Sequence, residues 1–429
     1  MPQVRPFEID KRLIFEAYKK IKSNGGSAGI DDVGMEVYSE NLNSNLYCLW
    51  NRMSSGSYMP KAVKLVEIPK SDGGKRPLGI PTISDRIAQM AAVMEMEPFI
   101  EPCFHEDSYG YRPHRSAHDA IVKAEKRCWK YAWVLDMDIS KFFDTIDHHL
   151  LMKAVELHIK ERWVLLYIKR WLKVPYQTKE GKLIDRTMGV PQGSVIGPLL
   201  ANLFLHYVFD KWMQLHYPQI PFERYADDSV CHCRTREEAE DLKFKLSQRF
   251  SDCNLRLNED KTKIVFCKMT SRRTETYPIT SFDYLGFTFR PRAAIDRRNK
   301  VLFTSFLPAI SKKSTAKIHA IIKSWNLSSF KNRGLRWLAE KIDSIVRGWI
   351  TYYARFGKTE FWKVMKHLNL TIARWVKKKY KRFWRKGLVA AHYWLGYLAE
   401  KDPNLFYHWQ IGYVPYARQK KMERIRRAV

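Results

Sequence analysis

The sequence predicts an α+β protein with strands in its first 305 residues and helices in the remainder. Residues 61–82 alternate apolar and polar side chains around a Gly-Gly turn, and Tyr225-Ala226-Asp227-Asp228 places a turn between two apolar runs. After residue 305, apolar residues recur at helical spacing. A chain of 429 residues that is 45% hydrophobic can bury a large core, and its length predicts two or three domains.

The N-terminal part is expected to combine helices with one hairpin. Residues 1–60 have helical character, interrupted by the glycine-rich loop 23–31. Such a loop can bring backbone N–H groups close to phosphates, although three glycines also make an ordinary turn. In the hairpin, residues 70–76 form the turn. The elements expected next are a helix at 83–100 and a buried strand at 133–139 that carries acidic residues at its C-terminal end.

The rest of the chain predicts one further strand and several helices. Leu242, Leu246 and Phe250 are spaced four apart, as on the apolar face of an amphipathic helix. Residues 284–289 predict a strand with a glycine kink. The expected helices span residues 147–173, 197–212, 239–250, 315–325, 334–355 and 361–386.

The charge of the chain is strongly basic and unevenly distributed. The formal net charge is +30, and 28 of the 75 Lys and Arg residues lie at 311–429, against six of the 45 Asp and Glu residues. Eight of the 14 Trp residues lie in the same stretch. Cations mixed with aromatic rings suit nucleic acid, which offers both phosphates and base faces. The sequence therefore predicts a nucleic-acid partner.

Cysteine usage and hydropathy predict a cytoplasmic protein without a membrane segment. The seven cysteines are odd in number and lack CxxC spacing, which argues against a disulfide framework and a Cys-pair zinc site. Cys231 and Cys233 would share one face of a strand, where buried hydrophobic residues are favoured over metal ligands. No segment is long and apolar enough to span a bilayer, and the start lacks the apolar core of a signal peptide.

Three carboxylates predict a site for divalent cations. Asp227 and Asp228 are adjacent at a turn, where they repel each other, and Mg²⁺ is bound by one or two carboxylates together with substrate phosphates. An ordinary surface turn is the alternative for this pair alone. Asp138 ends a separate buried strand, and phosphoryl transfer at two metals needs carboxylates from separate elements. We expect Asp138 and Asp227 to be the principal ligands and Asp228 to support them, with Asp136 either a further ligand or a capping or salt-bridging residue.

The order of these motifs resembles the palm of reverse transcriptases. Asp138 with Phe142-Phe143 is followed by Met188-Gly-Val-Pro-Gln-Gly-Ser-Val-Ile-Gly-Pro-Leu-Leu-Ala-Asn202 and then by Tyr225-Ala-Asp-Asp228. The resemblance covers nearly the whole chain and is closest to proteins encoded in bacterial group II introns, of the type that lacks an endonuclease domain. It implies a right-hand polymerase fold with an antiparallel palm sheet. The implied domains are fingers and palm at 1–305, a helical thumb or maturase (X) domain at 306–400 and a basic tail at 401–429.

The same resemblance implies a function and its cofactors. The chain would be an RNA-dependent DNA polymerase that uses two Mg²⁺ ions, with Mn²⁺ as an alternative metal, and extends DNA primers on RNA templates with dNTPs. It would also bind group II intron RNA as a splicing maturase and support intron mobility. Metal binding is assigned to Asp138, Ile139 and Asp227, and catalysis to Asp138, Asp227, Asp228 and Lys261.

Further positions match the family's nucleotide site. Phe143 matches the aromatic gate that excludes a 2′-OH, since a flat apolar ring leaves that hydroxyl crowded and unsatisfied. Either Phe142 or Phe143 is expected to be a core residue. Lys261 matches the lysine that protonates the leaving pyrophosphate, with Lys263 or a plain charged turn as alternatives. The dNTP-binding positions implied by the resemblance are Lys70, Arg76, Ile139, Phe143, Gln192 and Gly193.

Nucleic-acid contacts are expected in three places. Arg112 and Arg115 match a stretch that lines the template path, and Tyr284 with Gly286 matches the primer grip. In the basic region, Trp349, Tyr352, Tyr353 and Phe356 share one helical face and are interpreted as core. The cations that we expect to contact RNA phosphates are Arg347, Lys377, Lys378, Lys379, Lys381, Arg382 and Arg385.

Alternative functions remain open at this point. One is an RNA-binding splicing factor whose polymerase is incidental, and another is a domesticated host reverse transcriptase in defence or repair. An RNA-templated RNA polymerase is disfavoured, because Phe143 offers no polar contact to a ribose 2′-OH. The protein is expected to be a monomer or a weak dimer.

Overall fold

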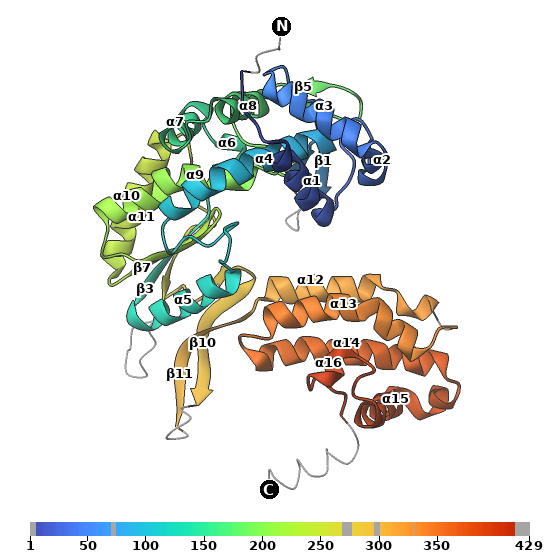
Figure 1. Ribbon diagram of the computed structural model, residues 1–429. Coiled ribbons are helices and arrows are strands. Elements are labelled where there is room, and N and C mark those ends of the chain that lie inside the picture. Colours follow the sequence, from blue (N-terminus) through green and yellow to red (C-terminus); the bar gives the residue numbers. More distant parts are fainter. Residues whose placement is uncertain (1–5, 70–73, 268–276, 296–300, 331, 417–429) are drawn as a thin grey trace. The chain divides into compact units, whose positions relative to one another are not determined.

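A computed structural model describes residues 6–69, 74–267, 277–295, 301–330 and 332–416 (Figure 1). The chain forms two compact units. Unit 1 comprises Met1–Ala124 and Tyr131–Ile264, and unit 2 comprises Glu125–Lys130 and Val265–Val429. The functional boundary expected near residue 305 lies inside unit 2 and stays a prediction. Lys70 lies outside the described residues.

Unit 1 begins with a group of helices. They are α1 (Lys11–Asn24), α2 (Met35–Glu40), α3 (Leu42–Ser54) and α4 (Ile83–Ile100). Helix α1 starts at Asp10, whose carboxylate accepts from the Arg12 N–H, and α4 starts at Thr82, whose hydroxyl accepts from the Asp85 N–H. Helix α4 packs against α1, α3 and α9 (Gly197–Leu205), so it lies in the centre of this part of the core.

The expected N-terminal hairpin is present. Strands β1 (Val63–Pro69) and β2 (Lys75–Ile80) pair antiparallel, with Ile68 opposite Arg76. Two short strands, β4 (Tyr176–Gln177) and β5 (Leu183–Ile184), extend this sheet in the order β2-β1-β4-β5.

The second sheet of unit 1 carries the acidic motifs. Its strands are β3 (Trp133–Met137), β6 (Phe222–Tyr225), β7 (Asp228–Cys233) and β8 (Lys263–Phe266), in the order β6-β7-β3-β8. Strand β7 pairs antiparallel with both β6 and β3. Helix α11 (Arg236–Asp252) covers β3 and β7 with Leu242, Leu246 and Phe250, which are fully buried, as their spacing predicts. Cys231 and Cys233 are also buried and not disulfide-bonded.

The remaining helices of unit 1 surround these sheets. They are α5 (Ala117–Lys130), whose last six residues belong to unit 2, α6 (Phe142–Thr145), α7 (His148–His158), α8 (Arg162–Lys173), α9 and α10 (Lys211–His216). The expected helix at 197–212 is not one regular helix, because a π-helical turn, η2 (His206–Asp210), separates α9 from α10. A π-turn adds one residue to the helix and so changes which side chains face inward. This turn brings Asp210 into the core.

Unit 2 contains a three-stranded sheet and a helical bundle. The sheet has the order β11-β10-β9, formed by β9 (Phe282–Tyr284), β10 (Phe287–Ile295) and β11 (Leu302–Ile310). Residues 284–289 are not one kinked strand, as the sequence suggested, but a hairpin. Leu285 and Gly286 form its two-residue turn, both with positive φ (50° and 82°), which is the backbone of a type I′ turn. The bundle consists of α12 (Lys312–Ser324), α13 (Leu335–Tyr353), α14 (Lys358–Lys379), α15 (Arg382–Lys401) and α16 (Tyr407–Gln410), with a 3₁₀ turn, η3 (Leu327–Ser329).

The last predicted helix is interrupted. Residues 361–386 do not form one helix, because Tyr380 adopts an extended backbone. Helix α15 is itself broken at Gly387, where φ is +83°, and it packs back against α14. The return is stabilised by aromatic contacts, since Tyr380 and Phe383 both lie against Trp394 at ring distances of 5.5 Å. Trp349, Tyr353 and Phe356 pack into the unit 2 core, as expected, and Phe287 contacts Tyr352, Tyr353 and Phe356.

The α+β class is thus confirmed. Among the described residues, no helix is long and apolar enough to cross a membrane.

Candidate active site

The three acidic residues meet at one edge of the β6-β7-β3-β8 sheet. Asp138 directly follows β3, Asp227 lies in the turn between β6 and β7, and Asp228 is the first residue of β7. The register pairs Met137 with Ser229, so the end of β3 lies beside the turn. Asp227 is half-buried and Asp228 is exposed. The pKa of Asp227 is raised, mainly by burial and also by the negative charge of Asp138.

The Asp227 turn has a backbone that few residues adopt. Ala226 has a φ of +57°, in the left-handed region. Residues 107–111 pack against it, because the Tyr109 N–H donates to the Arg224 carbonyl at 2.8 Å. A Cβ atom at Gly110 would lie 2.4 Å from the Ala226 nitrogen, so only glycine fits there. The loop at 107–111 therefore supports the turn from one side.

A buried ion pair supports the same turn from below. The Arg224 guanidinium donates to both carboxylate oxygens of Asp210 at 2.7 and 2.6 Å, and both side chains are fully buried. Its third nitrogen donates to Asn202 Oδ1 at 3.0 Å and to the Ala226 carbonyl at 3.1 Å. The Asn202 side-chain amide in turn donates to the Gly110 carbonyl at 2.6 Å. This network ties α9, the π-turn and loop 107–111 to the residue that precedes Asp227.

Asp138 is held by the segment that follows α11. The Asn258 N–H donates to the Asp138 carbonyl at 2.8 Å, and an isolated bridge joins Ile139 to Leu257. Lys261 reaches the carboxylate itself, with its Nζ 3.2 Å from Asp138 Oδ2. The Lys261 side chain is 61% exposed, so its ammonium contacts the carboxylate and is also open to solvent. Ile139 is buried, so its side chain is not available to a ligand.

The expected nucleotide-binding residues also gather in unit 1. Arg76 Nε donates to Gln192 Oε1 at 2.5 Å, and Gln192 Nε2 donates to Asp144 Oδ1 at 3.2 Å. Phe142 is 2% exposed and belongs to the core, as expected for one residue of the pair, whereas Phe143 is only half-buried. Arg76 also lowers the pKa of Asp227, although burial and other contacts make the net shift upward. Arg76, Gln192 and Asp144 thus form one series of hydrogen bonds, and the charge of Arg76 acts on Asp227.

Gly193 is required for a reason that the sequence did not indicate. Its φ is +105°, and a Cβ atom there would lie 2.6 Å from the Gly79 carbonyl. The Gly79 N–H donates to the Gln192 carbonyl at 2.7 Å. Gly193 therefore permits the loop to pack closely on β2, which fixes Gln192 beside the hairpin that carries Arg76.

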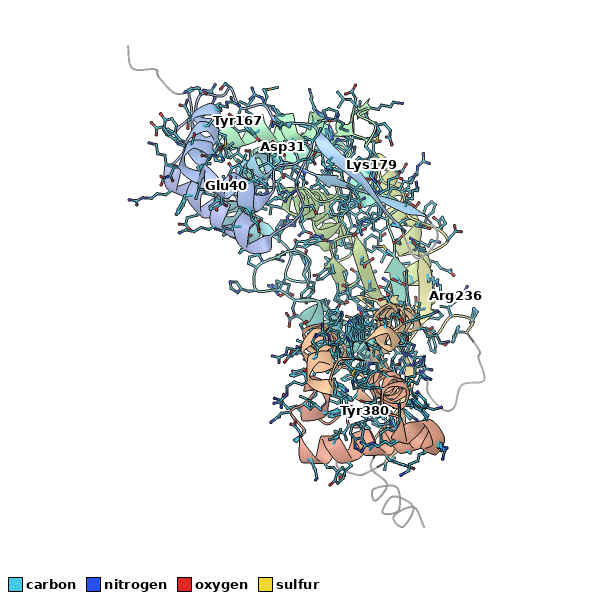
Figure 2. All side chains as sticks on the ribbon, turned by 90° about the vertical axis from the view of Figure 1, so that its right-hand side faces the viewer. Asp31, Glu40, Tyr167, Lys179, Arg236 and Tyr380 are labelled. Atoms are coloured by element: carbon cyan, nitrogen blue, oxygen red, sulfur yellow. The ribbon has the colours of Figure 1, made fainter. Side chains whose placement is uncertain are left out.

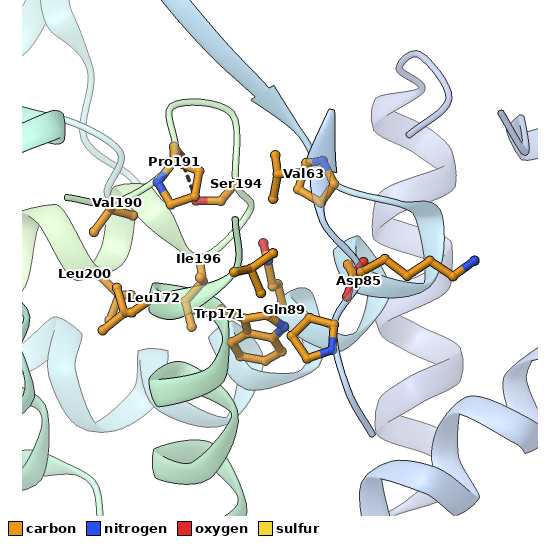
Figure 3. Close-up of a pocket in the computed structure, with 14 residues that line it drawn as sticks. Val63, Asp85, Gln89, Trp171, Leu172, Val190, Pro191, Ser194, Ile196 and Leu200 are labelled. Carbon is orange, nitrogen blue, oxygen red and sulfur yellow. Dashed lines mark hydrogen bonds between the residues drawn. The ribbon is translucent and has the colours of Figure 1, made fainter. Parts of the chain in front are cut away.

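A small cavity lies behind this loop (Figure 3). Gln89 of α4 accepts from the Val195 N–H at 2.9 Å, and the Ser194 hydroxyl donates to the Pro191 carbonyl at 2.9 Å, the contact dashed in Figure 3. Asp85 also lines the cavity and accepts from Tyr58 and from Thr82. The cavity holds about 10 Å³, which is no more than one water molecule occupies. It is a packing defect behind the Gln192 loop rather than a substrate site.

The two arginines of the expected template stretch differ. Arg112 has a 5% exposed side chain, pairs with Glu101 at 2.8 Å and donates to the carbonyls of His105 and Ser108. This geometry gives Arg112 a role in shaping the loop. Arg115 is exposed and lies over the Tyr109 ring.

The expected primer grip lies at the β9–β10 turn in unit 2. Tyr284 is buried, and the Gly286 carbonyl accepts from the Ser311 N–H and the Ser314 hydroxyl, both at 3.0 Å. The Tyr352 hydroxyl donates to the Leu285 carbonyl at 2.9 Å. The start of α12 and the end of α13 thus fix this turn.

The expected RNA-binding cations cluster where α14 meets α15, at Tyr380 (Figure 2). Lys378, Lys381, Arg382 and Arg385 are exposed, and Lys377 and Lys379 are half-buried. Arg382 also lies over the rings of Phe383 and Trp394 at 4.7 Å. Arg347, on α13, is exposed and covers the Tyr407 ring at 4.3 Å.

Comparison with protein families decides the relationship. Residues 68–289 match the reverse transcriptase (RNA-dependent DNA polymerase) family, and residues 315–394 match the group II intron maturase-specific domain. The chain belongs to the reverse transcriptase family. The first match contains all three acidic residues and the strands from β2 to β9, and the second runs from within α12 to within α15. A reverse transcriptase domain followed by a maturase-specific domain confirms the group II intron type of reverse transcriptase.

Individual relatives agree with this relationship. Protein YkfC from Escherichia coli is 34% identical over 274 residues, covering 55% of this chain and 71% of that protein. Group II intron-encoded protein LtrA from Lactococcus lactis is 31% identical over 273 residues, covering 63% of this chain and 44% of LtrA. Nuclear intron maturase 1 from Arabidopsis thaliana is 32% identical over 93 residues, 22% of this chain and 13% of that protein. This reverse transcriptase thus spans less than half the length of LtrA.

Several residues around the site were not singled out from the sequence. Asp210, Arg224 and Gly110 support the Asp227 turn, and Asp144 holds Gln192. Arg224 directly precedes the Tyr-Ala-Asp-Asp motif and Asn202 ends the Pro-Gln-Gly motif, so their positions in the motifs were visible. The long-range partner of Arg224 in the π-turn was not.

Proposed function

We propose that this reverse transcriptase copies RNA into DNA with Asp138 and Asp227 as its metal-binding carboxylates. The observation that carries the proposal is the juxtaposition of Asp138, at the end of β3, with the strained turn that holds Asp227. Two carboxylates close enough to raise the pKa of one of them are a fitting donor set for Mg²⁺, because the cation removes the repulsion between them. Bound there, Mg²⁺ would stabilise negative charge on the attacking and leaving oxygens.

Other residues of the chain would bind the nucleotide and transfer the proton. Arg76 reaches into the site from β2 and would hold the triphosphate by charge-assisted hydrogen bonds, with Lys70 as its expected neighbour on the hairpin. Phe143 would lie under the sugar and exclude a 2′-OH, and Gln192 would contact the incoming nucleotide. Lys261, which is exposed and next to Asp138, would donate a proton to the departing pyrophosphate. Asp228 would support the turn.

We infer a right-hand arrangement for the polymerase. In this proposal, residues 1–305 provide fingers and palm, and the β6-β7-β3-β8 sheet is the palm sheet. Residues 306–400 provide a thumb that also serves as the maturase domain, and 401–429 are a basic tail. Arg115 would line the template path, Arg112 would shape its loop, and the turn at Leu285-Gly286 would contact the primer.

Primer extension tests the polymerase proposal. Wild type and Asp227→Ala are compared on an RNA template with a DNA primer, Mg²⁺ and dNTPs. Wild type is expected to extend the primer, and Asp227→Ala to lose at least about 10³-fold in rate while its RNA binding is retained. Asp252→Asn removes an exposed carboxylate at the end of α11 and serves as the matched control. Equal extension by wild type and Asp227→Ala would refute the two-carboxylate assignment.

A second function is supported by a separate observation, the maturase-specific domain at residues 315–394. We propose that unit 2 binds the RNA of a group II intron and assists its splicing. The cations around Tyr380 would neutralise phosphates of that RNA. Splicing of the intron RNA that flanks the gene, measured with wild type and Asp227→Ala, separates the two functions. Splicing by the Asp227→Ala protein would establish a maturase role independent of DNA synthesis, and an absence of any intron fold in the flanking DNA would favour a host function instead.

A further inference from the structure

Unit 2 contains a large cavity that the polymerase site does not use. It is lined by α12, the η3 turn and α14, is partly open to solvent and has a volume of about 490 Å³. This is within the range of about 300–1,000 Å³ that is typical of small-ligand sites, so it can hold one nucleotide but not a duplex. The cavity that follows the Gln192 loop in unit 1 is about fiftyfold smaller and carries no comparable space.

Regular helical spacing directs polar side chains into this cavity. His367, Thr371, Arg374 and Lys378 follow one another at intervals of four, three and four residues, which places them on one face of α14. His319 and Lys323 are four residues apart on α12 and line the opposite side. The row of α14 side chains that lines the cavity is thus polar along three turns, and apolar residues of the same two helices, Ile322 and Trp375, line the cavity beside it.

The lining is strongly positive. Lys323, Arg374 and Lys378 line the cavity, and no acidic residue is among the described residues that do so. Within the described parts of the chain, no ion pair joins any of these three side chains to a carboxylate. Three cations around one concavity repel one another, so an anionic ligand would stabilise the arrangement.

Two histidines form the wall between the helices. The rings of His319 and His367 are stacked, with centroids 4.0 Å apart and planes at 28°. Within the described residues, His319 Nε2 is buried and has no hydrogen-bond partner. Burial lowers the pKa of both histidines, and His319 and Arg374 lower that of His367 further, so both rings are neutral near pH 7. Neutral imidazoles can donate to and accept from the edges of a base.

The cavity adjoins the cationic surface described above. Lys378 belongs both to the cavity lining and to the cluster of cations around Tyr380. An RNA strand bound to that cluster can therefore continue into the cavity and stay on positively charged surface throughout. This continuity favours a nucleotide that is part of an RNA strand over a free nucleotide, and it rests on the proposal that unit 2 binds RNA.

We propose that this cavity binds one unpaired nucleotide of an RNA strand, with Lys323, Arg374 and Lys378 at its phosphates. His319 and His367 would contact the base. Unpaired nucleotides are the parts of RNA whose base edges and faces a protein can reach. The cavity would thus recognise a loop or bulge, in addition to the phosphate contacts of the surrounding surface.

Crosslinking locates the nucleotide directly. A single-stranded RNA of twelve uridines that carries one 4-thiouridine is irradiated with the full-length protein, and the crosslinked peptides are identified by mass spectrometry. Crosslinks are expected in α12 and α14, at the peptides that contain His319 or His367. Binding of the same RNA is measured by fluorescence anisotropy, and a large excess of uridine 5′-monophosphate or inorganic phosphate is added as competitor.

Matched variants distinguish the effect of the cavity cations from the effect of lowering the overall positive charge. Lys323→Gln with Arg374→Gln removes two cavity cations, and Lys317→Gln with Lys363→Gln removes two exposed cations from the same two helices outside the cavity. We expect the first pair to weaken binding by about tenfold and to lose the α12 and α14 crosslinks, because the phosphates of a nucleotide in the cavity would lose two charge-assisted contacts. The control pair is expected to keep the crosslinks. His367→Phe keeps an aromatic ring but cannot donate to or accept from a base edge, so it should weaken binding of the RNA.

Each outcome is decisive. Equal weakening by both pairs, with crosslinks elsewhere, would overturn the cavity proposal and leave RNA binding by unit 2 intact. Displacement of the RNA by the mononucleotide at similar concentration would show a free-nucleotide site and overturn it as well. No binding of the RNA by the wild type would refute both the cavity and the RNA-binding function of unit 2.

Discussion

Arg224 and Asp210 form a fully buried ion pair directly behind the turn that carries Asp227. The same guanidinium donates to the Ala226 carbonyl at 3.1 Å, so the pair is connected to Asp227 through a single residue. Burial raises the pKa of Asp210, but the charge and hydrogen bonds of Arg224 outweigh it, and the net pKa is lowered. Asp210 is therefore ionised at neutral pH and holds Arg224 in place.

Arg224→Lys is expected to impair synthesis more than folding. Lysine keeps the charge beside Asp210 but cannot reach Asp210, Asn202 and the Ala226 carbonyl together. We expect kcat for primer extension to fall by about tenfold to 100-fold, since misplacement of a catalytic group by about 1 Å costs that much. The KM for dNTPs and RNA binding should change little, which single-nucleotide kinetics can measure.

A control variant tests whether the effect is specific to the position of Arg224. Arg236→Lys alters an arginine that pairs with Glu240 on the surface of α11 and should leave kcat unchanged. Arg224→Ala is expected to destabilise the protein by about 3–5 kcal/mol, because it leaves Asp210 buried without a partner. A normal kcat for Arg224→Lys would show that the ion pair serves folding alone.

Phe143→Ala is expected to relax the choice of sugar. The alanine side chain would leave space for a 2′-OH, so discrimination between dNTPs and rNTPs should fall by about 10-fold to 200-fold, the range for one lost packing contact. The ratio of kcat/KM for dATP and ATP opposite the same template base is the measurement. Phe143→Tyr retains a ring and should retain the discrimination. A dNTP preference that is the same in Phe143→Ala and wild type would exclude Phe143 as the gate.

The elements that carry the acidic residues could be predicted because their signals are local. The apolar run before Asp138 predicts a buried strand, and the two apolar runs around Asp227 predict a hairpin. Alternation along β7 also predicts that Cys231 and Cys233 share a face, and both are buried. Each of these patterns lies within about ten consecutive residues, so the sequence alone was sufficient to predict these elements.

Other features depend on contacts between distant segments. The Leu285-Gly286 turn was predicted as a kink, because one glycine in an apolar run does not distinguish a bend from a two-residue turn. That turn is fixed by Ser311, Ser314 and Tyr352, which are 25 to 67 residues away from their partners in the sequence. Likewise, Asp210 faces Arg224 only because a π-turn shifts the phase of the helix, and no local pattern in residues 197–212 indicates that shift.

Four lysines around Tyr380 are expected to determine how RNA binding depends on salt. Changing Lys377, Lys378, Lys379 and Lys381 to Gln should lower the slope of log Kd against log salt by up to about 3, because each contact with a single strand contributes about 0.7. Binding of an intron RNA is measured between 50 and 300 mM salt, an interval of about sixfold over which counterion release dominates.

The matched control for this prediction removes the same charge from unit 1. Lys153, Lys160, Lys169 and Lys173 are exposed on or beside α7 and α8, and their change to Gln should leave the slope nearly unchanged. An identical slope in the Tyr380-cluster variant and the wild type would place the RNA-binding surface elsewhere.

His408 is expected to make the stability of unit 2 depend on pH. It is fully buried, and burial lowers its pKa to about 3. Its Nε2 contacts Asn369 Oδ1 at 2.9 Å, the same atom that accepts from the Trp409 indole, and Asn369 donates onward to the Tyr413 carbonyl. This arrangement requires a proton on His408 Nε2, and it joins α14 to α16.

The direction of the effect follows from the lowered pKa of His408. Because the unfolded chain takes up the proton near pH 6.5 and the folded chain does not, stability is full above that pH and falls as the pH is lowered toward 3. The loss amounts to about 1.4 kcal/mol for each pH unit below 6.5. Urea unfolding followed by Trp fluorescence at pH 7.5 and 5.5 measures it.

Comparison of a His408 variant with the wild type isolates the contribution of His408 to the pH dependence of stability. His408→Gln keeps a donor for Asn369 but cannot be protonated, so its free energy of unfolding should fall by about 1.4 kcal/mol less than that of the wild type over this interval. His149→Gln, an exposed histidine at the start of α7, should follow the wild type. If His408→Gln and wild type lose the same stability between pH 7.5 and 5.5, then His408 is not held neutral in the folded protein, and its contact with Asn369 is made by a protonated ring.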